Sequence, residues 1–107
     1  EDCPTGIYCA NDITAVGMLK YLRRCRNLYF TPSIIASDDI EEAQYTKPML
    51  TTVGLPKEEM GRFALYLLLD RMKGGHSGVV RMELSGKLLV RNSCSHVSES
   101  FWSDYCI

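Results

Sequence analysis

The sequence predicts an α/β fold built as three layers around a mostly parallel sheet. Short apolar runs rich in β-favouring residues alternate with two amphipathic helices, an order that gives a sheet with helices on its faces. The runs are continuously apolar, so each strand needs cover on both sides. With 107 residues and 46% hydrophobic side chains the chain can fill one core, yet two long helices are few for four or five strands. The predicted fold is therefore incomplete.

The first strand and the first helix are predicted over residues 5–10 and 13–24. The run TGIYCA ends at Asn11 and Asp12, and Asp12 suits a helix N-cap because its carboxylate can accept amide hydrogens of the first turn. Apolar residues recur at helical spacing, namely Ala15, Val16, Leu19 and Leu22. Basic residues crowd the end of this helix; they fit a phosphate-contacting patch or, more simply, the helix dipole.

A second buried strand is predicted over residues 30–37, where the run SIIA precedes Asp38 and Asp39. Residues 41–47 are polar and indicate one helical turn or a loop. Residues 48–53, PMLTTV, are again prone to form a strand.

The second helix, over residues 56–73, has the clearest pattern in the chain. Proline and acidic residues occupy its first turn, basic residues its last, and Gly74 with Gly75 ends it. The apolar stripe expected to face a core consists of Met60, Ala64, Leu67, Leu68 and Met72. Two further strands are predicted over residues 79–84 and 87–91.

Composition argues against several classes of protein. A net charge of −1 does not suit a chain that binds nucleic acid through its overall charge. The longest apolar run, residues 63–69, is too short for a bilayer, which needs about 20 helical residues.

Five cysteines without a C-x-x-C pair favour reduced thiols in the cytoplasm. Cys94 and His96 lack a second ligand pair, so no metal site is expected. Because the chain starts without Met or a signal-peptide pattern, it is expected to be part of a longer protein.

Polar residues directly follow the first two predicted strands, Asn11 after one and Asp38 after the other. Parallel sheets bind ligands outside the carboxyl ends of their strands, so both side chains are expected at one edge. Asp accepts hydrogen bonds and Asn both donates and accepts them, which suits the hydroxyls of a sugar or nucleoside. The alternative is that Asp12 and Asp38 or Asp39 only cap helices and turns. The spacing alone leaves both interpretations open.

The sequence shows little that resembles catalytic machinery. It contains no G-x-S-x-G, P-loop or G-x-G-x-x-G motif. His76 lies in a glycine-rich stretch expected to be a solvated turn, and Cys9 lies inside a predicted strand. Asp38 and Asp39 are neighbours in an extended segment, so they point to opposite faces. We expect neither enzyme activity nor a cofactor.

Several separate segments resemble the C-terminal part of lactose-repressor/galactose-repressor family regulators. In chain order they are YCAND (8–12), AVGML (15–19), SIIASDDI (33–40), PMLTTV (48–53), LLLDR (67–71) and LVRNS (89–93). The resemblance runs from about residue 4 to residue 93. It implies a two-lobed fold like that of type I periplasmic binding proteins, with a small-molecule effector in the cleft between the lobes.

The resemblance implies three effector contacts. Asn11 and Asp38 match cleft residues that hydrogen-bond effector hydroxyls, and Leu55 matches a position at the lobe crossover that can face the ligand. Because Leu55 is apolar, it can pack on a sugar face but cannot donate a bond. Ala36 and Ser37 stand where relatives usually have Gly and an aromatic residue, so no aromatic wall is assigned there.

The resemblance also implies how the chain is divided. Residues 1–93 would be the C-terminal part of the effector-binding and dimerisation domain, and residues 94–107 a C-terminal tail. The chain up to about residue 53 and from residue 87 onward would build one lobe, while the 56–73 helix would pack on the other. The expected homodimer contacts are Val16, Leu19, Tyr45 and Thr46. In the fragment, the helix is also expected to be able to exchange between copies through a hinge over residues 52–55.

The function implied by the resemblance is that of a cytoplasmic bacterial transcription regulator, a repressor, that senses a sugar or related metabolite. Operator DNA would be bound through a helix-turn-helix upstream of this chain. The alternative function is that of a periplasmic solute-binding protein for sugar transport.

Overall fold

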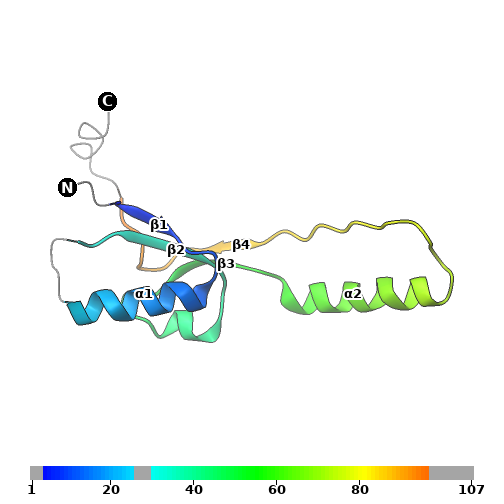
Figure 1. Ribbon diagram of the computed structural model, residues 1–107, viewed down its shortest axis with the longest axis horizontal. Helices are drawn as coiled ribbons and strands as arrows, with labels where there is room; N and C mark the ends of the chain where they lie inside the picture. The colour runs from blue at the N-terminus through cyan, green and yellow to red at the C-terminus, as the bar shows by residue number, and fades with distance from the viewer. Residues whose placement is uncertain (1–3, 26–29, 97–107) are drawn as a thin grey trace, which may run out of the picture.

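The computed structural model describes residues 4–25 and 30–96. These residues form a lobe and a long arm that projects from it (Figure 1). The lobe holds a four-stranded sheet, the helix α1 and the short 3-10 helix η1, whereas the arm holds the helix α2 and the extended segment that returns to the lobe. The elements are β1 (Gly6–Tyr8), α1 (Asp12–Cys25), β2 (Ser33–Asp38), η1 (Glu41–Gln44), β3 (Thr51–Gly54), α2 (Lys57–Met72) and β4 (Lys87–Leu89).

The sheet has the strand order β1-β2-β3-β4, and its first three strands are parallel. The returning strand β4 pairs antiparallel with β3, with Val53 opposite Leu88. The predicted α/β class and the mostly parallel sheet are thus confirmed. The element order also matches the prediction up to α2.

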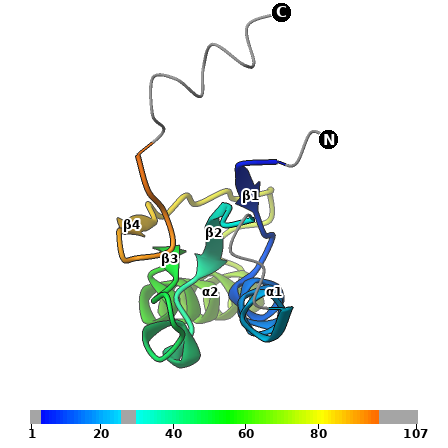
Figure 2. The same cartoon turned by 90° about the vertical axis from the view of Figure 1, so that its left-hand side faces the viewer.

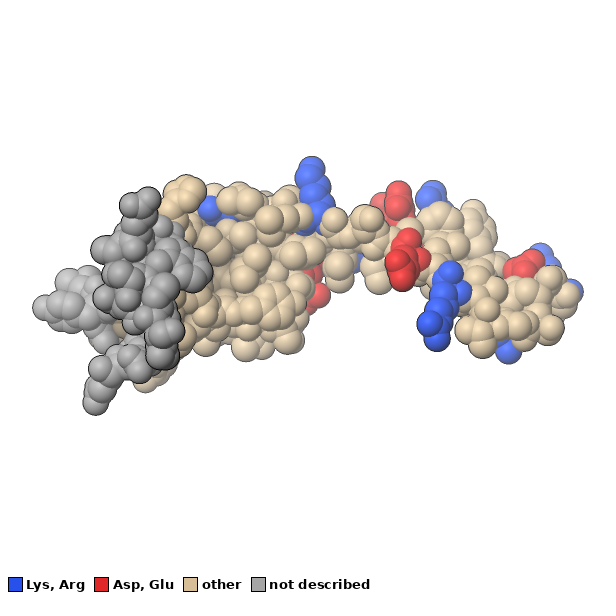
Figure 3. All heavy atoms as spheres, turned by 90° about the horizontal axis from the view of Figure 1, so that it is seen from above, with Lys and Arg blue, Asp and Glu red and all other residues tan. Residues whose placement is uncertain are grey.

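Helix α1 and η1 cover the same face of the sheet (Figure 2). Ala15, Val16 and Leu19 of α1 pack in one core with Ile34 and Ala36 of β2. Those β2 residues alternate with half-buried ones that point to the other face. In the described residues no helix covers that other face, so this chain supplies two of the three predicted layers. Seen from above, charged side chains of both signs are spread along the arm (Figure 3).

A buried carboxylate joins the loops at one edge of the sheet. Asp12 is fully buried; its Oδ1 accepts from the Thr52 hydroxyl at 2.6 Å, and its Oδ2 accepts from the Ile40 N–H at 3.0 Å. It does not cap the helix as predicted. Asn11 does so, because its Oδ1 accepts from both the N–H and the hydroxyl of Thr14, at 2.9 and 2.8 Å.

Helix α2 begins after Pro56 and ends in a glycine cap. Gly74 adopts φ +79°, and the N–H groups of Gly74 and Gly75 donate to Arg71 O and Asp70 O. This is the hydrogen-bond pattern of a Schellman motif, which glycine permits because it lacks Cβ. No residue of α2 is buried, so the stripe predicted to face a core is uncovered by the described residues.

The strand predicted over residues 79–84 is wrong, because this segment runs extended along the arm without strand pairing. A strand needs a neighbouring strand to bond with, and the described residues place α2 beside this segment (Figure 1). The strand predicted over residues 87–91 is present but shorter. Residues 26–29 and most of the predicted tail, from residue 97, lie outside the described residues.

We predict that Asp12→Ala lowers the free energy of unfolding by roughly 2–4 kcal/mol, because it leaves the Thr52 hydroxyl and the Ile40 N–H without their acceptor in a buried place. Denaturant titration of the variant and the parent protein measures this difference. Glu58→Ala, at an exposed site in the first turn of α2, is the control and should change stability by less than about 0.5 kcal/mol. Equal effects of the two substitutions would contradict the role given to Asp12.

Candidate functional site

The three residues predicted to contact an effector lie at one edge of the sheet. Asn11 follows β1, Asp38 is the last residue of β2, and Leu55 follows β3. Because these strands are parallel, their carboxyl ends meet at the same edge. The hydrogen bonds of Asp12 to Ile40 and Thr52 fix the start of α1, the loop after β2 and the strand β3 against one another there.

Asn11 is exposed, and its side chain caps the N-terminus of α1. Its amide oxygen already accepts the two hydrogen bonds from Thr14, which occupy both lone pairs. A ligand at this residue would therefore meet the amide NH₂ group as a donor. Capping was predicted for Asp12, but Asn11 provides it, and this role restricts what the Asn11 side chain can offer a ligand.

The backbone after β2 is unusual, because Asp38 has φ +136° and Asp39 has φ +54°. Residues with a Cβ rarely adopt such angles, although Asp and Asn tolerate them better than most. The carboxylate of Asp39 binds the Arg91 guanidinium, with 2.7 Å between Nη2 and Oδ1. Patterns of apolar and polar residues do not predict such backbone angles, so the sequence analysis missed this feature.

Leu55 lies where the two chain crossings between lobe and arm touch. It is 38% exposed. A Cβ placed on Gly86 of the returning segment would lie 2.9 Å from Val53 Cγ1, 3.2 Å from Gly54 O and 3.7 Å from Leu55 Cδ2. Only glycine lets the two crossings approach so closely, since any side chain at residue 86 would push them apart. Leu55 thus forms an apolar surface beside the polar edge.

An aromatic residue that the sequence analysis missed lies on the open face of the sheet. The Tyr8 hydroxyl is 2.9 Å from the Ser37 Oγ, and the Tyr8 side chain is 65% exposed. Ser37 stands where the family resemblance leads one to expect an aromatic residue, directly before Asp38. An aromatic ring therefore lies next to that position, supplied by the neighbouring strand.

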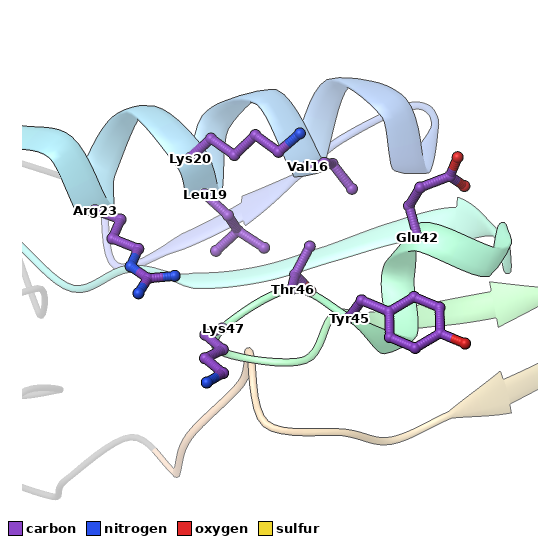
Figure 4. Close-up of a pocket in the computed structure, with 8 residues that line it drawn as sticks. All are labelled: Val16, Leu19, Lys20, Arg23, Glu42, Tyr45, Thr46 and Lys47. Carbon is purple, nitrogen blue, oxygen red and sulfur yellow. The ribbon is translucent and has the colours of Figure 1, made fainter.

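The four residues predicted to form a dimer interface line one groove between α1 and η1 (Figure 4). Its volume is about 220 Å³. Tyr45 is 74% exposed, whereas Val16 and Leu19 are each 7% exposed and belong mainly to the core. Thr46 is half-buried and uses its hydroxyl internally, donating to Ala43 O and accepting from Leu50 N–H.

Charged side chains surround this groove. Three cations line it, on α1 and after η1, together with one carboxylate on η1. They are Lys20, Arg23, Lys47 and Glu42. The groove therefore combines apolar walls, an exposed aromatic ring and charges of both signs, which is the composition of a polar-rimmed protein interface.

The described residues gather no group of three or more His, Cys, Asp or Glu side chains that could hold a metal ion. His76 contacts Asp70 at 2.6 Å between Nδ1 and Oδ2, at the far end of the arm rather than near the candidate site. Among the described helices, none is long and apolar enough to cross a membrane.

Similarity to known proteins identifies the class of protein to which this chain belongs. Residues 1–94 match the family described as periplasmic binding protein-like domain, and the chain belongs to this family. Its relatives are transcription regulators, as the resemblance to the lactose- and galactose-repressor family implied.

The HTH-type transcriptional repressor CytR of Escherichia coli (strain K12) is 38% identical over 92 residues, which cover 84% of this chain and 27% of the repressor. A LacI family transcriptional regulator from Enterococcus faecium with bound ribose is 30% identical with a TM-score of 0.78, covering 91% of this chain and 37% of that structure. The structure of the transcriptional regulator CelR–cellobiose complex is 31% identical with a TM-score of 0.75, and the match covers 84% of this chain and 28% of that structure. The chain thus spans 27% to 37% of the length of these proteins.

The cysteines offer a test of the packing beside the site. Cys9 is buried directly after β1, and this burial raises the pKa of its thiol, whereas Cys25 at the end of α1 is exposed. A raised pKa leaves less thiolate at neutral pH, and the thiolate is the reactive form. We predict that iodoacetamide at pH 7.5 labels Cys25 about tenfold faster than Cys9 or more.

Peptide mass spectrometry of quenched time points measures the two rates. In denaturant both cysteines should react at similar rates, which controls for differences in local sequence. Equal rates in the folded protein would show that the core next to the candidate site is open.

Proposed function

We propose that this chain is the effector-binding and dimerisation part of a DNA-binding transcription repressor that senses a sugar or related small metabolite in the cytoplasm. The observation that carries this proposal is the convergence of Asn11, Asp38 and Leu55 at the carboxyl edge of adjacent parallel strands, beside the crossings that lead to the arm. Relatives named as repressors, and relatives with bound ribose or cellobiose, support it.

The three residues divide the contacts with a hydroxylated ligand. Asp38 would accept hydrogen bonds from ligand hydroxyls through its carboxylate. Asn11 would donate through its amide NH₂, because its oxygen is held by Thr14. Leu55 would pack against an apolar face of the sugar, as its partial exposure allows.

Control of transcription would follow from linkage. If an effector prefers one arrangement of the lobes and operator DNA prefers one arrangement of the dimer, each changes the affinity for the other. DNA contact would come from a helix-turn-helix in the intact protein. This chain has a net charge of −1 and offers little counterion release on its own. The relatives named as transcription regulators favour this function over solute transport.

For the homodimer we propose the groove between α1 and η1 as the contact surface. A two-fold axis through this surface would bring each copy's Glu42 toward the other copy's cations, since the groove carries both signs of charge. Tyr45 would be the anchor, because it is the aromatic residue among those that line the groove and its side chain is largely exposed. Val16 and Leu19 would contribute the floor of the interface more than direct contacts.

The arm offers a second way for two copies of this chain to associate. Its helix leaves several large apolar side chains exposed, among them Leu65, Leu68 and Met72. Soluble monomers rarely tolerate contiguous apolar surface of this kind. Exchange of α2 between copies would cover it, with the hinge in residues 52–55. The mobile part of that hinge would start after Thr52, which is fully buried and bonded to Asp12.

We predict that Asp38→Asn weakens effector binding by about 10- to 100-fold, because a neutral amide replaces the charged acceptor while Asn still tolerates positive φ. Isothermal titration of the intact protein with ribose and with cellobiose measures the dissociation constants. Asp38→Ala should abolish the response of operator binding to the same sugar.

The matched control is Glu41→Gln, the same chemical change at an exposed residue of η1. It should titrate like the parent protein. An Asp38→Asn protein with the parent's affinity would refute the assignment of Asp38, and a parent protein that binds neither these sugars nor any other small metabolite would refute the proposed function.

We predict that Tyr45→Asp raises the dimer dissociation constant at least about tenfold, because it places a charge in the centre of the proposed interface. Analytical ultracentrifugation of the intact protein measures this constant. Tyr21→Asp is the control, since Tyr21 is an exposed tyrosine of α1 that does not line the groove.

Equal dimerisation of both variants would exclude the groove as the interface. A dimer of the 107-residue chain that survives Tyr45→Asp, but is lost when Leu68 and Met72 are both changed to Lys, would instead indicate exchange of the arm.

A further inference from the structure

Two consecutive residues at the candidate site hold backbone angles that residues with a Cβ avoid. Asp38 and Asp39 have φ +136° and +54°. Such angles persist only where the surrounding structure holds them, and they concentrate at binding sites. The contacts that hold this pair therefore bear on how the Asp38 carboxylate is presented.

Three hydrogen bonds hold Asp39 in this turn. Its carboxylate binds Arg91 at 2.7 Å, its N–H donates to the Thr52 hydroxyl oxygen at 3.4 Å, and its carbonyl accepts from Lys57 Nζ at 3.4 Å. The Arg91 contact is the shortest of the three, and it is partly shielded from solvent, since the Arg91 and Asp39 side chains are 15% and 29% exposed.

Arg91 is itself fixed in place by β3. Its Nη1 donates to Leu50 O at 3.0 Å, and its backbone N–H donates to the Thr51 Oγ1 at 2.9 Å. One guanidinium thus connects the start of β3 to the turn after β2. Because Arg91 follows β4, the segment returning from the arm reaches across the sheet to the candidate site.

We propose that Arg91 is a positioning residue for the effector site: by holding Asp39 at positive φ it orients the Asp38 carboxylate toward the ligand. This inference rests on the proposed function and deepens it, because it assigns the geometry of the acceptor to a residue with no ligand contact of its own. The effector class it serves is a neutral polyhydroxylated molecule that donates hydrogen bonds to Asp38.

The two-pronged shape of arginine matters for this role. Two different guanidinium nitrogens serve two acceptors on different segments, Asp39 Oδ1 and Leu50 O. Lysine carries the same charge as a single flexible point and cannot hold both acceptors in one fixed plane. Arg91→Lys therefore separates the geometric role from the charge.

The first test compares Arg91→Lys with Ser93→Ala in the intact protein. Ser93 lies on the same returning segment, is buried, and bonds Ile34 O and the Thr51 N–H. Its loss should lower stability without reaching the turn at residues 38–39. Titration with ribose or cellobiose, whichever binds the parent protein more tightly, should show that Arg91→Lys weakens affinity about tenfold or more while Ser93→Ala stays within about twofold.

A coupling measurement follows from the same geometry. Asp39→Asn should reproduce the loss seen in Arg91→Lys, and the double variant should bind no more weakly than either single variant, because both changes break one interaction. Additive losses would overturn the proposal. So would an Arg91→Lys protein with the parent's affinity, or a loss of affinity in Ser93→Ala as large as in Arg91→Lys.

A second measurement needs no ligand and so separates this proposal from the proposed function. Backbone ¹³C chemical shifts report φ, and in Arg91→Met those of Asp38 and Asp39 should move away from the positive-φ range. Those of the core residues Ala15 and Ile34, to which the guanidinium donates no hydrogen bond, should stay unchanged. Unchanged shifts at Asp38 and Asp39 would overturn the positioning role. If the shifts move as expected but no sugar binds the parent protein, the proposed function fails and the structural role of Arg91 stands.

Discussion

A single buried carboxylate holds together the edge of the lobe where the candidate site lies. Asp12 begins α1, and the free N–H groups of the first helical turn favour a negative charge there. With the hydroxyl of Thr52 and the N–H of Ile40 as donors, it joins the loop after β1, the loop after β2 and the strand β3. The Thr52 oxygen in turn accepts from the Asp39 N–H. Asn11 directly precedes this group, Asp38 is linked to it through Asp39 and Thr52, and Leu55 follows the strand that contains Thr52.

Much of this arrangement could be predicted from the sequence, because it depends on local patterns. The continuous apolar runs located β1, β2 and β3, and helical spacing located α1 and α2. Placing Asn11 and Asp38 at one edge required only the rule that parallel strands end together. The choice between Asn11 and Asp12 as the helix cap was not predictable, since both side chains suit a cap and long-range bonds to Thr52 and Ile40 decide the matter.

Other features depend on contacts between distant parts of the chain. The positive φ angles of Asp38 and Asp39 are held by Arg91, which lies 52 residues after Asp39 in the chain. No local sequence pattern contains that information. Residues 79–84 have the composition of a strand but find no strand to pair with in the described residues. Composition indicates what a segment can form, and partners decide what it forms. The exposed face of α2 illustrates the same point.

The route of the chain through the arm also sets an order of assembly. Strands β1, β2 and β3 follow one another with short detours, whereas β4 can pair with β3 only after the chain has travelled along α2 and back. Closing that long loop is the most costly step in chain entropy, so the non-local pairing forms late. Arg91 and Ser93 arrive with it. During synthesis, the core of the lobe can therefore form before the turn at Asp38 and Asp39 is secured. The candidate site takes its final geometry only after the segment from the arm has returned.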